Sequence, residues 1–142
     1  MSSTIRHVTF DCADPRALAR FWARVTGWPL LEEPAPGYDE AAVGVASEGR
    51  PRLYFVAVPE GKTVKNRLHL DIVPDDRTQD EEIARLAGLG ATVVSDQRPE
   101  FGWVILADPE GNEFCVELSP AERDAAIAAE AAAAEATAVA PR

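Results

Sequence analysis

The chain has 142 residues, enough for one domain of ordinary size or for two very small units that share a core. It carries 14 Lys and Arg against 24 Asp and Glu, a formal net charge of −10. This acidic balance weighs against a nucleic-acid partner, whose phosphates demand positive charge, and against an anionic membrane surface. The 46% hydrophobic and 27% charged residues are typical of a folded protein.

No targeting or membrane segment is predicted, and the cysteines indicate a reducing environment. The N-terminal residues lack the apolar region of a signal peptide, and no stretch of about 18 strongly apolar residues occurs. Cys12 and Cys115 lie far apart with no CxxC pair, so they predict neither a disulfide framework nor a zinc ribbon. We therefore expect a cytoplasmic protein.

The sequence contains an internal repeat. Residues 5–10 (Ile-Arg-His-Val-Thr-Phe) correspond to residues 67–72 (Arg-Leu-His-Leu-Asp-Ile), and aligning His7 with His69 gives an offset of 62 positions. In both copies an Asp follows the histidine by seven positions, an amphipathic helix comes next, and a Gly ends that helix. The matching order predicts two modules of the same architecture.

The first copy begins with a strand at 5–10 and continues with a helix. Asp14 is a good N-cap, and Pro15 suits the first helical position because its missing N–H has no partner there. The helix ends at Gly27. Its apolar stripe consists of Leu18, Phe21, Trp22 and Val25. Three strands are predicted to follow, over roughly 28–33, 40–46 and 52–58.

The second copy follows the same plan. After the strand at 67–72, a shorter apolar stripe predicts a helix that ends at Gly90, with acidic residues at its positive end. Strands are predicted over roughly 91–96, 102–107 and 112–118, the last two joined as a hairpin by the turn Asp-Pro-Glu-Gly-Asn at 108–112.

Each half therefore has the order β-α-β-β-β, which predicts an α+β fold with one domain over residues 1–119. Module one covers 4–59 and module two covers 67–119. We expect the two modules to form a curved mixed sheet around one pocket, because neither half buries much surface alone. Residues 120–142 form an Ala-rich tail, with 12 alanines among residues 121–142, and predict a helical extension without a catalytic role.

The alternation of side chains splits three strands into an apolar and a polar face. The polar faces carry His7, Thr9 and Asp11 in the first strand, His69 and Asp71 in the second copy, and Cys115 and Glu117 in the last strand. A solvated sheet face explains such carboxylates without a function. The two histidines are the only ones in the chain and occupy the same repeat position, so we expect them to converge in one pocket. Imidazole is a frequent ligand for divalent transition metals, so a metal site there is one alternative.

The chain resembles the vicinal oxygen chelate superfamily, which includes glyoxalase I, bleomycin- and fosfomycin-resistance proteins and extradiol dioxygenases. The resemblance rests on the paired modules and covers residues 4–119. It rests also on three segments: His-Val-Thr-Phe, Lys-Asn-Arg-Leu-His-Leu-Asp and Asp-Pro-Glu-Gly-Asn-Glu-Phe-Cys-Val. These are similar to the glyoxalase-like branch in particular. The superfamily spans several chemistries, so the resemblance implies the fold more strongly than the function.

The resemblance implies a metal site with two substituted positions. His7 and His69 match the ligands of the two first strands, whereas Val56 stands in place of a ligand in module one and Cys115 stands where a ligand Glu is usual. A site made of His7, His69 and Cys115 suits a divalent metal such as zinc better than Mg²⁺ or Mn²⁺. Without a metal, Cys115 is a small buried hydrophobe, as is Cys12.

Two functions follow as hypotheses. In the first, the pocket binds or sequesters a small organic ligand, without an intact family metal site and with no cofactor. In the alternative, the protein is a divalent-metal-dependent lyase, isomerase or dioxygenase acting on a substrate with vicinal oxygens, and a carboxylate carries a proton. The predicted ligand-contacting residues are Thr9, Asp11, Tyr54, Val56, Asp71, Trp103 and Glu117. The resemblance also implies a homodimer.

The segment between the modules concentrates positive charge. It contains both lysines of the chain, Lys62 and Lys65, together with Arg67. A solvated crossover loop explains these residues, and the alternative is an anion clamp at the mouth of the site.

Overall fold

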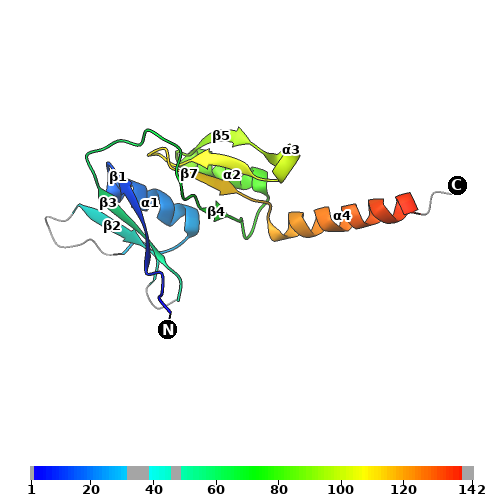
Figure 1. Cartoon of the computed structure of the whole chain (residues 1–142), viewed down its shortest axis with the longest axis horizontal. Coiled ribbons are helices and arrows are strands. Elements are labelled where there is room, and N and C mark those ends of the chain that lie inside the picture. The colour runs from blue at the N-terminus through cyan, green and yellow to red at the C-terminus, as the bar shows by residue number, and fades with distance from the viewer. Residues whose placement is uncertain (1, 32–38, 46–48, 139–142) are drawn as a thin grey trace.

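We describe the fold from a computed structural model of the chain, which describes residues 2–31, 39–45 and 49–138. The two modules lie side by side, and the C-terminal helix extends away from them (Figure 1). Module one contains β1 (His7–Cys12), α1 (Pro15–Thr26), β2 (Glu40–Val43) and β3 (Arg52–Ala57). Module two contains β4 (Asp71–Ile72), α2 (Gln79–Leu89), β5 (Thr92–Asp96), α3 (Arg98–Phe101), β6 (Val104–Ala107) and β7 (Glu113–Val116), and is followed by α4 (Pro120–Ala138).

Each module has its own mixed sheet. In module one the strand order is β1-β3-β2, with β1 parallel and β2 antiparallel to β3. In module two the order is β4-β7-β6-β5, with only the β4–β7 pair parallel. The α+β class and the C-terminal helix are confirmed, but the strands of one chain form two separate sheets instead of one curved sheet.

The two long helices begin and end as their sequences predict. The Asp14 carboxylate accepts a hydrogen bond of 2.9 Å from the Ala17 N–H, and Gly27 ends α1 with φ +70°. Thr78 and Glu81 form a capping box at the start of α2. Residues adjacent in sequence thus define where α1 begins and ends and where α2 begins.

Several predicted strands differ from those observed. The strand expected at 28–33 is reduced to one bridge between Leu30 and Val43. Pro29 has no N–H to donate to a neighbouring strand. Residues 32 and 33 lie outside the described residues. The strand expected at 40–46 ends at Val43, since Gly44 has φ +114°; residue 46 lies outside the described residues. The strand expected at 67–72 keeps only the two residues of β4, which pairs on one side only.

One short helix, α3, was not expected from the sequence. It forms between β5 and β6, where the N–H of Phe101 donates to the Gln97 carbonyl at 2.8 Å. Pro99 lies in its first turn and Gly102 ends it. This helix shortens the predicted strand 102–107 to the four residues of β6.

The modules share one hydrophobic core on the helical side of their sheets. The rings of Trp22 on α1 and Phe114 on β7 lie 5.2 Å apart, and both side chains are fully buried. The indole N–H of Trp22 donates to Asp108 at 3.1 Å. The core therefore joins module one to module two and leaves the opposite sheet faces for other contacts.

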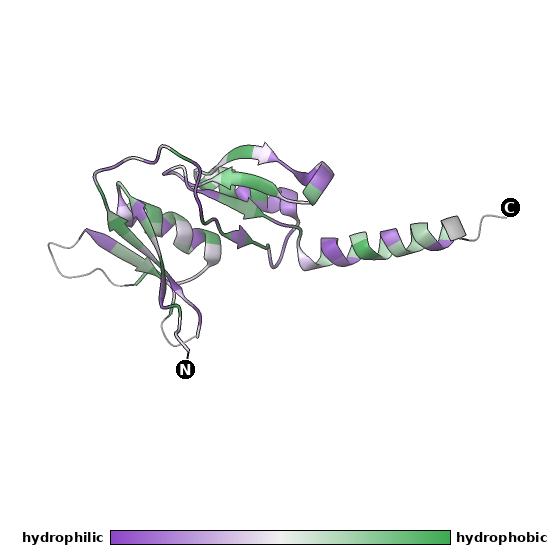
Figure 2. Ribbon diagram, viewed as in Figure 1, coloured by the Kyte–Doolittle hydropathy of each residue, from purple (hydrophilic) through white to green (hydrophobic). Residues whose placement is uncertain are grey.

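Helix α4 differs from the rest of the chain. Figure 2 shows weakly hydrophobic and hydrophilic segments alternating along it, without a strong apolar face. Its described side chains are mostly exposed, and its N-terminus is held by Glu122, whose carboxylate accepts from the Ser119 hydroxyl at 2.7 Å. Among the described residues, no helix has the length and apolar character needed to cross a membrane.

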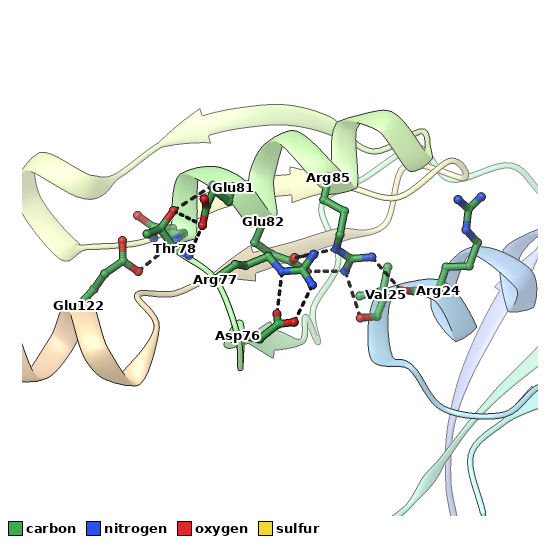
Figure 3. Close-up of polar contacts among 10 residues, drawn as sticks. Arg24, Val25, Asp76, Arg77, Thr78, Glu81, Glu82, Arg85 and Glu122 are labelled. Carbon is green, nitrogen blue, oxygen red and sulfur yellow. Dashed lines mark hydrogen bonds and ion pairs between the residues drawn. The ribbon is translucent and has the colours of Figure 1, made fainter.

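Polar contacts around Arg85 join the two helices of the core (Figure 3). Arg85 on α2 donates to the carbonyls of Arg24 and Val25, at the C-terminal end of α1. The same guanidinium donates to the buried Glu82 carboxylate at 2.7 Å, and Arg77 lies 3.4 Å from that carboxylate. Arg85 thus satisfies free carbonyls of one module and a buried charge of the other.

We predict that Arg85→Ala lowers the free energy of unfolding by about 2 kcal/mol, because Glu82 keeps only Arg77 and two helix carbonyls lose their donors. Urea denaturation followed by circular dichroism measures the loss. Arg20→Ala removes an exposed arginine of α1 and should cost less than about 0.5 kcal/mol. Equal losses of unfolding free energy for the two variants would show that the contacts of Arg85 do not join the modules.

Candidate metal and ligand site

The outer face of the module-two sheet brings together residues that are far apart in the sequence. Asp71 pairs with Cys115, and Cys115 pairs with Ile105, so the three residues form one row across β4, β7 and β6. Their neighbours Val116 and Leu106 are buried in the core. Strand alternation therefore directs the Asp71 and Cys115 side chains away from the core, on the face that His69 also reaches.

His69, Asp71 and Cys115 form a compact donor cluster. One ligand atom of each lies within 4.8 Å of the others, and the His69 Nδ1 is 3.6 Å from the Asp71 Oδ1. His69 and Asp71 are exposed, whereas Cys115 is buried. The cluster offers nitrogen, oxygen and sulfur at the boundary between the core and solvent.

The cluster lines a cavity of about 280 Å³. Trp103 and Glu117 line the same cavity, Ile105 supplies apolar surface, and Phe114 borders the cavity while its ring is buried in the core. The Trp103 ring stacks on Phe101 with centroids 5.0 Å apart, which fixes the aromatic wall. The volume is just below the range of about 300–1,000 Å³ typical of ligand pockets, so it suits a small molecule.

The Cys115 thiol is neutral near pH 7. Burial, followed by the neighbouring Asp71 carboxylate, raises its pKa to about 11 against a smaller opposite effect of Lys65. A thiol with such a pKa is a poor nucleophile. Without a metal the thiol is therefore a packed side chain and not the attacking group of a covalent reaction, and a metal bound there would displace its proton.

Glu113 anchors the inter-module segment to the start of β7. Its carboxylate accepts from the Lys62 ammonium and from the Asn66 N–H, each at 3.0 Å. Burial alone would raise the pKa of Glu113, but these hydrogen bonds outweigh it and lower the pKa to about 2. Glu113 is thus an ionised structural group on the cavity wall.

Glu117, a predicted ligand-contacting residue, is also engaged. Its carboxylate accepts from Arg123 on α4 at 2.9 Å, and its backbone N–H donates to the Ile72 carbonyl. This pair ties the beginning of α4 to the end of β7. Glu117 therefore faces the cavity with its charge already compensated.

Module one holds its histidine in a different environment. The His7 ring stacks on Tyr54 with centroids 4.9 Å apart, and its Nε2 accepts from the Arg52 guanidinium at 3.0 Å. Burial, followed by the charges of Arg52 and Arg6, lowers the pKa of His7. The imidazole is therefore neutral, with its Nε2 lone pair directed at a cation.

The two histidines do not meet within one chain. His7, Thr9 and Asp11 line a separate groove of about 870 Å³ between β1 and the inter-module segment. Within residues 2–31, 39–45 and 49–138, the metal-ligating group contains His69 but not His7. The expected convergence in one pocket fails because the shared core lies on the helical side and leaves the modules with separate outer faces.

The strand registers also show how the modules have diverged. Thr9 pairs with Tyr54 and Asp11 with Val56, so Tyr54 occupies the place in module one that Cys115 occupies in module two. A hydrogen bond to Glu40 raises the pKa of Tyr54, which keeps its hydroxyl neutral. Module one thus has an aromatic contact where module two has its donor cluster.

A family model described as the glyoxalase-like domain matches residues 7–117. The chain belongs to the glyoxalase-like domain family. The match spans both modules, and it places the glyoxalase-like domain in the vicinal oxygen chelate superfamily that the sequence motifs indicated. No match was found among curated proteins.

Solved structures share this fold. The fosfomycin resistance protein FosX from Mesorhizobium loti is 17% identical with a TM-score of 0.63, over 88% of this chain and 99% of that one. A glyoxalase/bleomycin resistance protein/dioxygenase family enzyme from Burkholderia phytofirmans is 20% identical with a TM-score of 0.62, over 80% and 97%. A mutant FosX from Listeria monocytogenes, complexed with Mn(II) and 1S,2S-dihydroxypropylphosphonic acid, is 16% identical with a TM-score of 0.66, over 87% and 98%. At these identities the likeness shows the fold alone.

The role of Asp71 as a third donor was not predicted. The sequence identified it as a ligand-contacting residue, and its position two residues after His69 already placed the two on one strand face. Its contact with Cys115 depends on a pairing between residues 44 positions apart, which periodicity does not reveal. Phe114 was assigned only to the core face, although it also borders the cavity.

We predict that Glu113→Gln reduces the acid sensitivity of the glyoxalase-like domain. The pKa of Glu113 is about 2 in the folded chain and 4.5 ordinarily, so ionised Glu113 stabilises the fold fully above pH 4.5, and this contribution disappears as the pH falls toward 2. Unfolding free energies measured across this interval should fall less for the variant than for the unmodified protein. Glu130→Gln, on exposed α4, should leave the acid dependence unchanged; the same result for Glu113→Gln would contradict the assignment.

Proposed function

We propose that the glyoxalase-like domain binds a small molecule in the module-two cavity at a divalent metal held by His69, Asp71 and Cys115. The observation that carries this proposal is the convergence of three donors within 4.8 Å on the wall of a cavity. A nitrogen, an oxygen and a sulfur ligand together suit zinc, which keeps a further position open for water or ligand in reactive sites. Mg²⁺ prefers oxygen ligands, and this donor set fits it less well.

A metal bound there supplies a Lewis acid that polarises a ligand oxygen. The protein's own side chains define which ligands fit. Trp103 and Ile105 bound the organic part, and Glu117 lines the same cavity with its carboxylate paired to Arg123. The FosX structure complexed with Mn(II) contains a ligand with two adjacent hydroxyl groups, and a ligand with adjacent oxygens is our proposal for this cavity. The reaction class, if the ligand is transformed, is that of a lyase, isomerase or dioxygenase.

A second candidate is a binding domain that uses no metal. It is favoured by the position of Asp71, which already contacts the His69 imidazole and receives a hydrogen bond from the Cys115 thiol. The cluster is therefore satisfied by its own members. In this case the cavity sequesters a small organic ligand through its aromatic wall and polar rim.

Metal analysis separates the two candidates. Protein purified without chelator or affinity tag should contain stoichiometric zinc. Removing a side chain that only supports a metal ligand typically lowers metal affinity by roughly 10–100-fold. His69→Ala and Cys115→Ala each remove a ligand and should lower zinc affinity by more than this. His69→Ala should weaken metal binding more than it weakens folding. Cys12→Ala removes the other buried thiol and should retain zinc. A metal-free protein whose stability is the same in chelator would establish the binding domain instead.

We also propose that a homodimer adds His7 of the partner subunit to the cluster. β1 and β4 are equivalent edge strands of the two sheets, and each pairs on one side only. His7 is the first residue of β1, and His69 lies two residues before β4. Pairing β1 of one copy with β4 of another is self-complementary, so a twofold dimer forms two equal contacts. Within this dimer Arg52 must turn away from the Nε2 of His7 before that nitrogen ligates.

The dimer proposal predicts complementation between variants. His7→Ala and His69→Ala should each bind zinc weakly when alone, whereas unfolding and refolding them together should restore high-affinity zinc binding to a fraction of the sites. Restoration occurs because one site of the mixed dimer has all of its ligands. A mixture of His69→Ala with Cys115→Ala should restore nothing, since both changes lie in module two. Sedimentation that shows only monomers would overturn the proposal.

We place this function in the cytoplasm. Both cysteines are free and buried, and among the described residues no helix could span a membrane. Free thiols persist in a reducing compartment.

A further inference from the structure

The inter-module segment carries three cations in a protein whose net charge is −10. Lys62 is occupied by its ion pair with Glu113, at 2.9 Å. Lys65 and Arg67, in contrast, make no ion pair with any carboxylate of the described residues. The two free cations therefore need either solvent or a ligand as their partner.

Lys65 borders the module-two cavity, whereas Arg67 borders only the groove of module one. The backbone around Lys65 is fixed on both sides. Asn66 donates through its N–H to Glu113 and through its side chain to Asn112 at 3.3 Å, and Lys62 binds Glu113 from the other side. The segment thus holds Lys65 at the wall of the cavity that Cys115 also lines.

Among the described residues that line the cavity, no carboxylate forms an ion pair with Lys65. Glu113 is neutralised by Lys62, and Glu117 is neutralised by Arg123. The third carboxylate, Asp71, belongs to the donor cluster. Among the described residues that line the cavity, Lys65 is the cation without a carboxylate partner.

We infer that Lys65 makes this cavity selective for small ligands with a negative group, a carboxylate or a phospho group, beside the oxygens that face the donor cluster. The inference rests on the proposed ligand site. The ammonium donates a charge-assisted hydrogen bond to the negative group, while the cluster receives the neighbouring oxygen. Elsewhere the acidic surface repels anions, so this one cation decides which ligands remain bound.

Glycolate and glycolamide test the inference, because they have nearly the same size and each carries a hydroxyl group beside a C=O oxygen, but only glycolate is charged. Titrations followed by NMR, with zinc and with chelator, give the affinity of each probe. Glycolate should bind more tightly than glycolamide, and Lys65→Gln should lower the glycolate affinity about tenfold while leaving glycolamide unchanged. Hydroxymethylphosphonate distinguishes a phospho group from a carboxylate in the same assay.

Two variants provide controls. Arg67→Gln removes the same charge from the same segment but does not line the cavity, so glycolate affinity should stay within about twofold. Lys65→Arg keeps the charge and should retain most of the preference. Thermal unfolding of each variant checks that the fold is intact.

The outcomes separate this inference from the metal proposal. If zinc binds stoichiometrically but Lys65→Gln leaves the glycolate preference unchanged, the role of Lys65 is overturned and the metal site stands. If zinc does not bind but a Lys65-dependent preference for glycolate persists, the metal proposal fails and the anion selectivity stands. Absence of glycolate binding, or equal effects of Lys65→Gln and Arg67→Gln, would also overturn the inference.

Discussion

The packing of Trp22 against strand β7 is the contact on which the arrangement of the site depends. The indole contacts Phe114 and donates to Asp108, which in turn accepts from the backbone N–H groups of Glu110 and Asn112. Burial raises the pKa of Asp108, although these donors favour its ionised form. One side chain of module one therefore fixes the turn that starts β7. Because Phe114 faces this core, Cys115 has to face the cavity.

This constraint explains why the outer sheet faces carry the chemistry. The helices and the aromatic cluster fill the core between the modules, so the polar strand residues of the predicted site lie on the other side of each sheet. On that side module two is supported by ion pairs at both ends of β7, from Lys62 to Glu113 and from Arg123 to Glu117. The donor cluster lies between these pairs and is held by neighbours whose charges are already satisfied. Such support keeps the site in place without a bound ligand.

The sequence predicts local features of this molecule well and long-range geometry less well. Asp14, Pro15 and Gly27 predicted α1 because capping depends on adjacent residues. The repeat of His7 and His69 predicted two modules, since a shared architecture leaves a shared pattern. The same repeat did not reveal that the histidines face separate cavities, because the module arrangement depends on how Trp22 and Phe114 pack. Likewise, Asp71 could be placed on the face of His69, but its contact with Cys115 required the register of β4 and β7.

The two modules share one order of helix and strands but carry different side chains around their equivalent histidines. Both retain a histidine at the same edge, yet in module one that ring is stacked on Tyr54 and bonded to Arg52, whereas in module two His69 lies beside Asp71 and Cys115. Duplication places equivalent edges at β1 and β4, and a free edge favours pairing with another strand. In the dimer that we propose, a closed twofold contact between these different edges would satisfy both in each copy and would leave neither free to extend the sheet. The divergence of the duplicated modules fits that proposal, because one half carries the donor cluster while the other half carries a further imidazole with an aromatic support.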